Sequence, residues 1–281
     1  MSRLSETFRI GRLEVAALSD GAPDRALGGF FYGVDPNQWT QALGISGPDE
    51  PVPFNFGTFL LRGDGRTVLV DAGYGAAAKK LGIPGGGELL QRIAELGVKR
   101  EEIDTIVHTH LHLDHCGWDT DAEHDREITF PKATVYVSQA EFDYWTGPTM
   151  EENPGAKASR AAIAPLLETG RVKTFEGEFG VTSSLTMVPT PGHTPGHCSV
   201  LVASQGEHLI IVGDAAHHPA HLEHHTWIPQ VDVDPAESAR SRAKVAQLAV
   251  DKNAIVTGGH FPILTLGRVR KVGTEYRWEG L

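Results

Sequence analysis

The chain has 281 residues and a formal net charge of −11 at pH 7, with 40 % hydrophobic and 22 % charged residues. This is an ordinary globular composition, and the chain is long enough to bury a large core. Because there is no excess of basic residues to neutralise phosphates, the composition argues against nucleic-acid binding and against adsorption to anionic membranes.

The N-terminal segment from Met1 to Asp20 contains no long apolar run and is interrupted by arginines. We therefore expect no secretory signal, no membrane-spanning helix and a cytoplasmic location. Loose alternation of apolar residues from Phe8 to Leu18 predicts a hairpin at the start of the fold. Residues 24–53 read as a long loop rich in aromatic side chains. These side chains either cover an apolar substrate or pack beneath the loop, and both alternatives stay open.

Two strands are predicted at residues 54–61 and 67–70, joined by the tight-turn sequence Gly63-Asp64-Gly65. Asp71 follows the second strand directly, where a carboxylate can orient a nearby ligand; a simple turn aspartate is the alternative. Leucine and isoleucine spacing predicts an amphipathic helix at residues 88–96, and Gly97 ends it.

The densest cluster of candidate functional residues is Thr109-His110-Leu111-His112-Leu113-Asp114-His115-Cys116-Gly117, directly after a predicted buried strand at residues 103–107. His110, His112 and Asp114 occupy alternate positions, so in an extended segment they share one face. His115 leaves that face, which indicates a second metal. Imidazole and carboxylate ligands suit zinc, with manganese, iron and cobalt as alternatives.

The following region predicts a strand at 133–137, a helix from Ser138 to Trp145, a helix at 158–168 and a strand at 171–175. The sequence Ser138-Gln139-Ala140-Glu141 has the form of a capping box at the start of the first of these helices. A strand at 184–188 then leads to His193, in a loop whose prolines and glycines restrict the backbone.

Two further strands, at 198–203 and 208–212, end at Asp214, and a helix from Pro235 to about Val250 precedes a last core strand at 254–257. His260 follows that strand, and the tail to Leu281 predicts one or two short strands. Cys116 and Cys198 are predicted to be free core residues. The remaining histidines between Asp214 and the helix are predicted to lie on a polar surface loop; they are His218, His221, His224 and His225.

Strands alternate with helices in both halves of the chain, and no linker separates the halves. We therefore expect an α/β fold of two packed mixed sheets with helices on the outer faces, forming one domain over residues 1–281. Side chains that follow several strand ends gather at one edge of such a fold.

The order of these side chains resembles the metallo-β-lactamase superfamily, over a region that extends roughly from Phe54 to Pro262. The resemblance implies an αββα sandwich with two divalent metal ions at one edge. By position, the first metal would be held by His110, His112 and His193. The second would be held by Asp114, His115 and His260, with Asp214 bridging both ions and Asp71 orienting the ligands.

Such a centre implies a hydrolase that uses a hydroxide held between two metal ions. Asp114 would also steer the nucleophile or receive a proton. The presence of Asp214 and the sequence around His260 most resemble the branch that contains N-acyl homoserine lactonases and methyl parathion hydrolase. We therefore predict hydrolysis of apolar lactones or carboxylic esters, with a phosphotriesterase as the first alternative and a non-catalytic metal- or ligand-binding protein as the second.

Relatives of this branch also suggest a homodimer. Its lactonases often carry a tyrosine three residues after the bridging aspartate, where this chain has His217. Histidine can donate a hydrogen bond to an oxyanion, so His217 is a catalytic candidate, and a purely structural histidine is the alternative. The aromatic side chains that would supply an apolar substrate pocket are Phe30, Phe31, Tyr32, Trp145 and Trp227.

Overall fold

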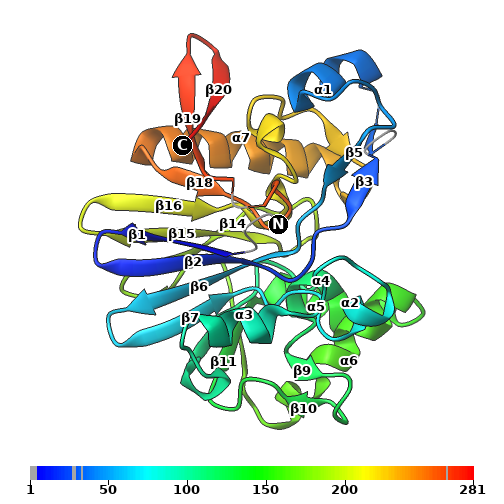
Figure 1. The fold of residues 1–281 in the computed structure, drawn as a ribbon, viewed down its shortest axis with the longest axis vertical. Helices are drawn as coiled ribbons and strands as arrows, with labels where there is room; N and C mark the ends of the chain where they lie inside the picture. The colour runs from blue at the N-terminus through cyan, green and yellow to red at the C-terminus, as the bar shows by residue number, and fades with distance from the viewer. Residues whose placement is uncertain (1–4, 27–29, 33, 264) are drawn as a thin grey trace.

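The computed structural model describes residues 5–26, 30–32, 34–263 and 265–281. Two seven-stranded sheets pack against each other, and helices lie on their outer faces (Figure 1). The predicted αββα sandwich of the α/β class is therefore confirmed, whereas the assignment of residues 1–281 to one domain stays a prediction. Within the described part of the chain, no helix combines the length and apolar character needed to cross a membrane.

The first sheet carries the predicted N-terminal hairpin at one edge and parallel strands at the other. Its order is β1 (Ser5–Ile10), β2 (Leu13–Ser19), β6 (Gly57–Gly63), β7 (Arg66–Val70), β8 (Thr105–Val107), β11 (Thr134–Ser138) and β12 (Val172–Phe175). Neighbours from β1 to β7 are antiparallel, and β7, β8, β11 and β12 are parallel. The carboxyl ends of β7, β8 and β11 therefore meet at one edge of the sheet.

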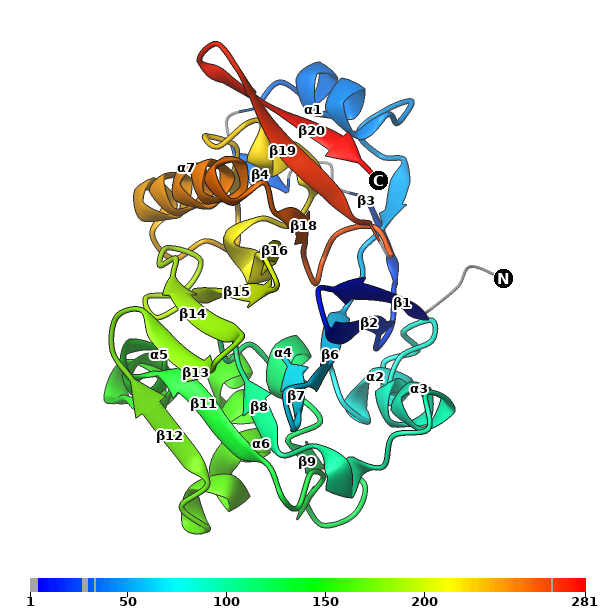
Figure 2. The ribbon, with the colours of Figure 1, turned by 90° about the vertical axis from the view of Figure 1, so that its left-hand side faces the viewer.

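The second sheet has the order β13 (Phe179–Thr182), β14 (Leu185–Pro189), β15 (Cys198–Ser204), β16 (Glu207–Ile211), β18 (Ile255–Thr257), β19 (Gly267–Val272) and β20 (Glu275–Gly280). Strands β16 and β18 are parallel neighbours, so their carboxyl ends also lie side by side. The short strands predicted for the tail are the six-residue strands β19 and β20, which form the C-terminal hairpin seen in Figure 2.

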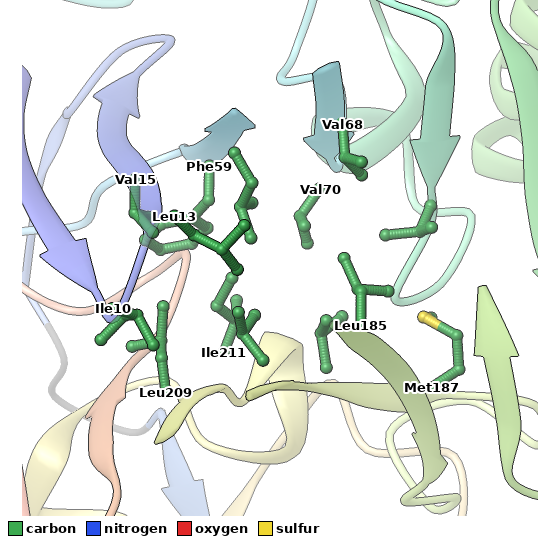
Figure 3. Close-up of a cluster of buried hydrophobic side chains, with 14 of the residues drawn as sticks. Ile10, Leu13, Val15, Phe59, Val68, Val70, Leu185, Met187, Leu209 and Ile211 are labelled. Atoms are coloured by element: carbon green, nitrogen blue, oxygen red, sulfur yellow. The ribbon is translucent and has the colours of Figure 1, made fainter. Parts of the chain in front are cut away.

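The main core lies between the two sheets. Val15, Phe59 and Val70 of the first sheet point toward Leu185 and Ile211 of the second, as Figure 3 shows. These side chains stand at alternate strand positions, which is why one face of each sheet is apolar. Each fully buried large apolar side chain contributes about 1.5–3 kcal/mol to folding.

Helices cover the outer face of each sheet. The first sheet packs against α3 (Leu89–Glu95) and α6 (Pro154–Glu168), and the second packs against α7 (Pro235–Lys252). The predicted start of α7 is confirmed: Asp234 accepts a hydrogen bond from the backbone N–H of Glu237, and Pro235 occupies the first turn. Cys116 and Cys198 are buried and free, as predicted.

The remaining elements are short. They are β3 (Asp24–Ala26), β4 (Phe31–Tyr32), α1 (Pro36–Leu43), β5 (Pro51–Pro53), α2 (Ala77–Lys80), α4 (Leu113–Cys116), β9 (Thr120–Asp121), β10 (Glu127–Ile128), α5 (Gln139–Thr146) and β17 (Ile228–Pro229), with single 3-10 turns at Arg100–Glu102, Pro148–Met150, Gly213–Ala215 and Pro219–Leu222.

The prediction that residues 24–53 form a loop was incomplete, because this segment contains helix α1. The side chain of Asp35 accepts a hydrogen bond from the Asn37 backbone N–H, and Pro36 follows at the first helical position. An Asp-Pro pair at this position is an ordinary helix-start signal, so the sequence did carry the information.

Candidate metal centre

The candidate site lies where β7, β8, β16 and β18 end. Asp71 follows β7 and has a left-handed backbone, with φ of +59°, a conformation that costs free energy for a residue other than glycine. Its carboxylate accepts hydrogen bonds from the Thr109 backbone N–H and hydroxyl, both at 2.8 Å. Asp71 therefore joins the end of β7 to the histidine-rich segment that follows β8.

We had expected this histidine-rich segment to be extended, but it is not extended throughout. His112 has an extended backbone, but helix α4 begins at Leu113, so Asp114 and His115 lie in a helical turn. Successive residues in a helix are rotated by about 100° around its axis, whereas those in a strand alternate between two faces. The turn therefore sends Asp114 and His115 toward a different part of the site from His110 and His112.

The first group of donor atoms comes from His110, His112, His193 and Asp214, which lie within 4.8 Å of one another. His112 Nδ1 lies 2.8 Å from His110 Nε2 and 3.0 Å from His193 Nε2. His193 Nε2 lies 3.3 Å from Asp214 Oδ2. Three imidazole nitrogens and one carboxylate oxygen thus converge on one point.

The second group comes from Asp114, His115 and His260, again within 4.8 Å. His260 Nε2 lies 3.4 Å from Asp114 Oδ2, and His115 Nε2 lies 3.7 Å from the same oxygen. Asp214 reaches this group too, with Oδ1 at 3.3 Å from His115 Nε2 and Oδ2 at 3.1 Å from His260 Nε2. Its carboxylate therefore lies between the two groups.

Acceptors on the far side of four imidazole rings determine which nitrogen faces the site. His115 Nδ1 is 2.9 Å from Asp71 Oδ2, His193 Nδ1 is 3.2 Å from Asp232 Oδ1, and His260 Nδ1 is 2.7 Å from the Asn55 carbonyl. His110 Nδ1 donates to the Thr109 hydroxyl, whose own proton goes to Asp71. Each Nδ1 carries its proton outward, so Nε2 is the nitrogen of each ring that is left to bind a metal.

The histidine pKa values shift in opposite directions in the two groups of donors. Burial lowers the pKa of His110 well below its ordinary value and the pKa of His112 to about 3, so both imidazoles are neutral. Burial acts in the same direction on His115 and His260, but Asp214 and Asp114 outweigh it and raise their pKa values. Without metal, protons on these two histidines balance the carboxylates, and metal binding would release them.

These residues fit two divalent metal ions. His112 Nδ1 lies 2.8–3.0 Å from the Nε2 atoms of His110 and His193, so one cation could be bound by a lone pair from each of the three nitrogens. Ligands ~2.0–2.1 Å from a tetrahedral ion are themselves ~3.3 Å apart, close to the separations observed here. Asp214 Oδ1 is buried with no hydrogen-bond partner in the described part of the chain, which is the mark of an atom built to bind an ion.

Glu141 of α5 joins the two segments that carry the first group, and sequence reasoning missed this role. One carboxylate oxygen accepts from the Leu111 backbone N–H and Trp145 Nε1; the other accepts from the Thr194 hydroxyl and the Gly196 N–H. Burial raises the pKa of Glu141, and these four donors oppose that shift. The predicted capping box is half formed: the Ser138 hydroxyl accepts from the Glu141 N–H, while the Glu141 carboxylate turns to the site.

Two further buried groups support the centre. Asp232 accepts from His193 and also contacts the buried Arg242 guanidinium of α7 at 3.2 Å. His197 Nε2 accepts a hydrogen bond of 2.9 Å from the Asp214 backbone N–H. A Cβ on the neighbouring Gly213, which has φ of +57°, would lie only 2.6 Å from that nitrogen. The sequence around Asp232 contains no motif that would have identified it as a partner of His193.

A model of the metallo-beta-lactamase superfamily matches residues 58–260. The chain belongs to this superfamily. Relatives include the N-acyl homoserine lactonase AttM of Rhizobium radiobacter, 28 % identical over 177 residues, which are 62 % of this chain and 64 % of AttM. An N-acyl homoserine lactonase of a Bacillus species is 25 % identical over 230 residues, 76 % of this chain and 84 % of the relative. The chain thus spans less than two thirds of AttM.

Two solved structures share this fold. The hydrolase AbOPH aligns over 100 % of this chain and 98 % of its own with a TM-score of 0.86 and 24 % identity. AidC, a dizinc quorum-quenching lactonase, aligns over 99 % of this chain and 98 % of its own with a TM-score of 0.84 and 22 % identity. At these identities the likeness concerns the fold.

A cavity of about 240 Å³ opens onto the candidate metal centre. Candidate ligands including His112, Asp114 and Asp214 line this cavity. Of the predicted aromatic pocket residues, Phe30 lines the same cavity. Phe31 packs instead against Trp39 and His221.

The other predicted pocket residues lie elsewhere. Trp145 is buried beneath His112, with ring centroids 5.0 Å apart. Trp227 stacks on His224 and lines a separate hollow. Tyr32 belongs to β4, and its side chain lies outside the described residues. Phe54 and Phe56, which we had assigned only to the strand at residues 54–61, line the cavity instead.

His217 lies inside the candidate centre. Its Nε2 is 3.2 Å from Asp214 Oδ2, and its ring is stacked parallel to that of His260 with centroids 5.4 Å apart. The prediction of a polar surface loop after His217 was wrong for His221, which is fully buried and accepts a hydrogen bond from the His217 backbone N–H. Aromatic side chains such as Phe31 cover this loop, and such long-range packing is not visible in a local histidine-rich sequence.

Proposed function

We propose that this protein is a dinuclear metal-dependent hydrolase that opens lactones or cleaves other carboxylic esters. The observation that carries the proposal is the convergence of two donor groups on the shared carboxylate of Asp214 at the floor of a cavity. The names of relatives such as AttM support a lactone as substrate. The comparisons lend no support to the phosphotriesterase alternative.

We assign the first metal to His110, His112 and His193, and the second to Asp114, His115 and His260, with Asp214 shared. Zinc is the proposed ion because nitrogen and carboxylate donors at these separations suit it, with manganese, iron and cobalt as alternatives. When bound, two such ions supply a water of lowered pKa and polarise the substrate oxygen.

The protein's own groups would complete the reaction. Asp114 lines the cavity and can receive a proton there. His217 differs from four of the candidate ligand histidines, because its Nδ1 has no acceptor among the described residues that would hold one tautomer. Since its Nε2 lies at the centre, we propose that His217 donates a proton or hydrogen bond to the oxygen that gains negative charge.

The proposal is tested by comparing second-order rate constants on protein reconstituted with zinc or manganese. A long-chain acyl homoserine lactone would be compared with a methyl aryl phosphotriester. We expect the lactone to react much faster than the phosphotriester. The opposite ranking would support the phosphotriesterase. No rate above the metal-only background for either substrate would mean that the proposed substrate class is wrong, and protein that stays metal-free in the presence of zinc or manganese would favour the non-catalytic alternative.

A further inference from the structure

Arg25 of β3 lines the same cavity as the candidate metal ligands. Its guanidinium carbon lies 4.8 Å from the centroid of the Phe54 ring and 5.9 Å from that of Phe56. The Phe54 ring in turn stacks on the imidazole of His260, with centroids 4.2 Å apart. One aromatic ring therefore separates a permanent positive charge from the centre.

This charge has no acidic partner in the described part of the chain. No carboxylate lies within ion-pair distance of Arg25 there, although most other arginines of the structure have one or bond a carbonyl oxygen. Asp24 immediately precedes Arg25 in the extended strand β3, so its side chain points to the opposite face. Arg25 is exposed, so its guanidinium is accessible to a ligand that enters the cavity.

The aromatic contacts leave the binding edge of Arg25 available. A guanidinium that stacks on aromatic faces is held through its flat surface, while its N–H groups point outward in the plane. That edge matches the two oxygens of a carboxylate, which it can bind through two parallel hydrogen bonds. Tyr74 lines the same cavity and packs against Phe56, so its hydroxyl is a second donor near the same position.

We propose that Arg25 binds a carboxylate of the substrate. The preferred substrates are then lactones or esters that carry an acidic group a short chain away from the carbonyl, in place of wholly neutral ones. This inference rests on the proposed function, since it takes the metal centre as the position of the reacting carbonyl. It adds a specificity residue that the sequence motifs do not indicate.

Binding of dicarboxylates tests the inference without requiring turnover. In the zinc-loaded protein, one carboxylate of glutarate, adipate or pimelate would bind the metals and the other would reach Arg25. Calorimetry would compare each with the monocarboxylate of equal chain length, such as hexanoate for adipate. We expect the best dicarboxylate to bind about fivefold more tightly than its monocarboxylate, the upper end of the effect of one exposed ion pair.

Three variants make the result specific. Arg25→Gln should abolish the preference for the dicarboxylate, and Arg25→Lys should keep part of it, because lysine retains the charge without the planar fork. Arg9→Gln is the matched control, since Arg9 is an exposed strand arginine that does not line the cavity. Equal binding of dicarboxylate and monocarboxylate by the wild type would overturn the inference, as would an unchanged preference in Arg25→Gln.

Turnover separates this inference from the proposed function. Mono-4-nitrophenyl adipate and 4-nitrophenyl hexanoate differ only in the terminal carboxylate, and Arg25→Gln should lower the ratio of their kcat/KM values about fivefold. If neither ester reacts but Arg25 still governs adipate binding, the proposed hydrolase fails and the carboxylate site stands. If both esters react with a ratio that Arg25→Gln leaves unchanged, the hydrolase stands and the carboxylate site fails.

Discussion

Glu141→Gln should weaken binding at one of the two proposed metal positions more than at the other. The Glu141 carboxylate accepts four hydrogen bonds, and two of its donors, on Leu111 and Thr194, lie next to the ligands His112 and His193. Glutamine has nearly the same shape but only one acceptor oxygen. Its amide group would therefore face two of the four donors and could bond neither.

The magnitude follows from those contacts. Hydrogen bonds to a charged group contribute about 1.5–3 kcal/mol each, so losing two should lower the free energy of unfolding by about 3–6 kcal/mol. Groups that orient metal ligands typically change metal affinity by about 10–100-fold when altered. We expect a loss of this size at the position of His110, His112 and His193, because Glu141 bonds the segments that carry them.

Two measurements check this expectation. Urea unfolding of the metal-free protein gives the stability, and zinc titration against a chromophoric chelator gives two dissociation constants. Glu152→Gln is the control, because Glu152 is a highly exposed glutamate whose ion pair with Lys157 lies on the surface. The reasoning would be refuted if Glu141→Gln lowered both metal affinities equally, or if it lowered stability with both affinities unchanged.

Two other substitutions test the metal centre. His112→Ala should abolish turnover and reduce bound metal, since it removes a donor that lies within 3.0 Å of His193 Nε2; full activity with full metal content would exclude His112 from the centre. His217→Phe should preserve metal content and lower turnover, and an unchanged rate would leave His217 structural.

Burial raises the pKa of Asp20 to about 6, so the folded protein retains a proton that the unfolded chain releases above its ordinary pKa of 3.8. Wild-type stability should therefore fall by up to about 3 kcal/mol from this group as pH rises from 4 to 7. Asn cannot ionise, so the free energy of unfolding of Asp20→Asn should rise relative to that of the wild type as the pH increases from 4 to 7. Urea unfolding measures this difference, and a difference that does not change with pH would contradict the assignment.

Much of the fold was predictable because its elements carry local signals. The turn Gly63-Asp64-Gly65, the Asp234-Pro235 helix start and the alternation in β2 each specify a conformation through neighbouring residues. The helix α1 was missed although its Asp35-Pro36 start was visible. The turn of α4 was missed because alternate histidines were read as a strand, and a four-residue helix has no periodicity long enough to correct that reading.

The sequence by itself determined which residues are candidates for metal binding. The seven histidines and aspartates proposed as metal ligands all follow predicted strands. Parallel strands place their carboxyl ends at one edge of a sheet whatever the details of packing, so these side chains gather there. Local sequence also determined most helix and strand positions, because propensity and capping act over a few residues.

Only the tertiary structure decided what surrounds those candidates. Glu141, Asp232 and Asn55 are 30 or more residues away from the histidines or main-chain segments they support, so no local pattern links them. The same holds for Arg25, which reaches the cavity through packing on Phe54, and for Trp145, which packs beneath His112 instead of lining the cavity. Such contacts depend on how distant surfaces pack, and that is settled by the whole chain at once.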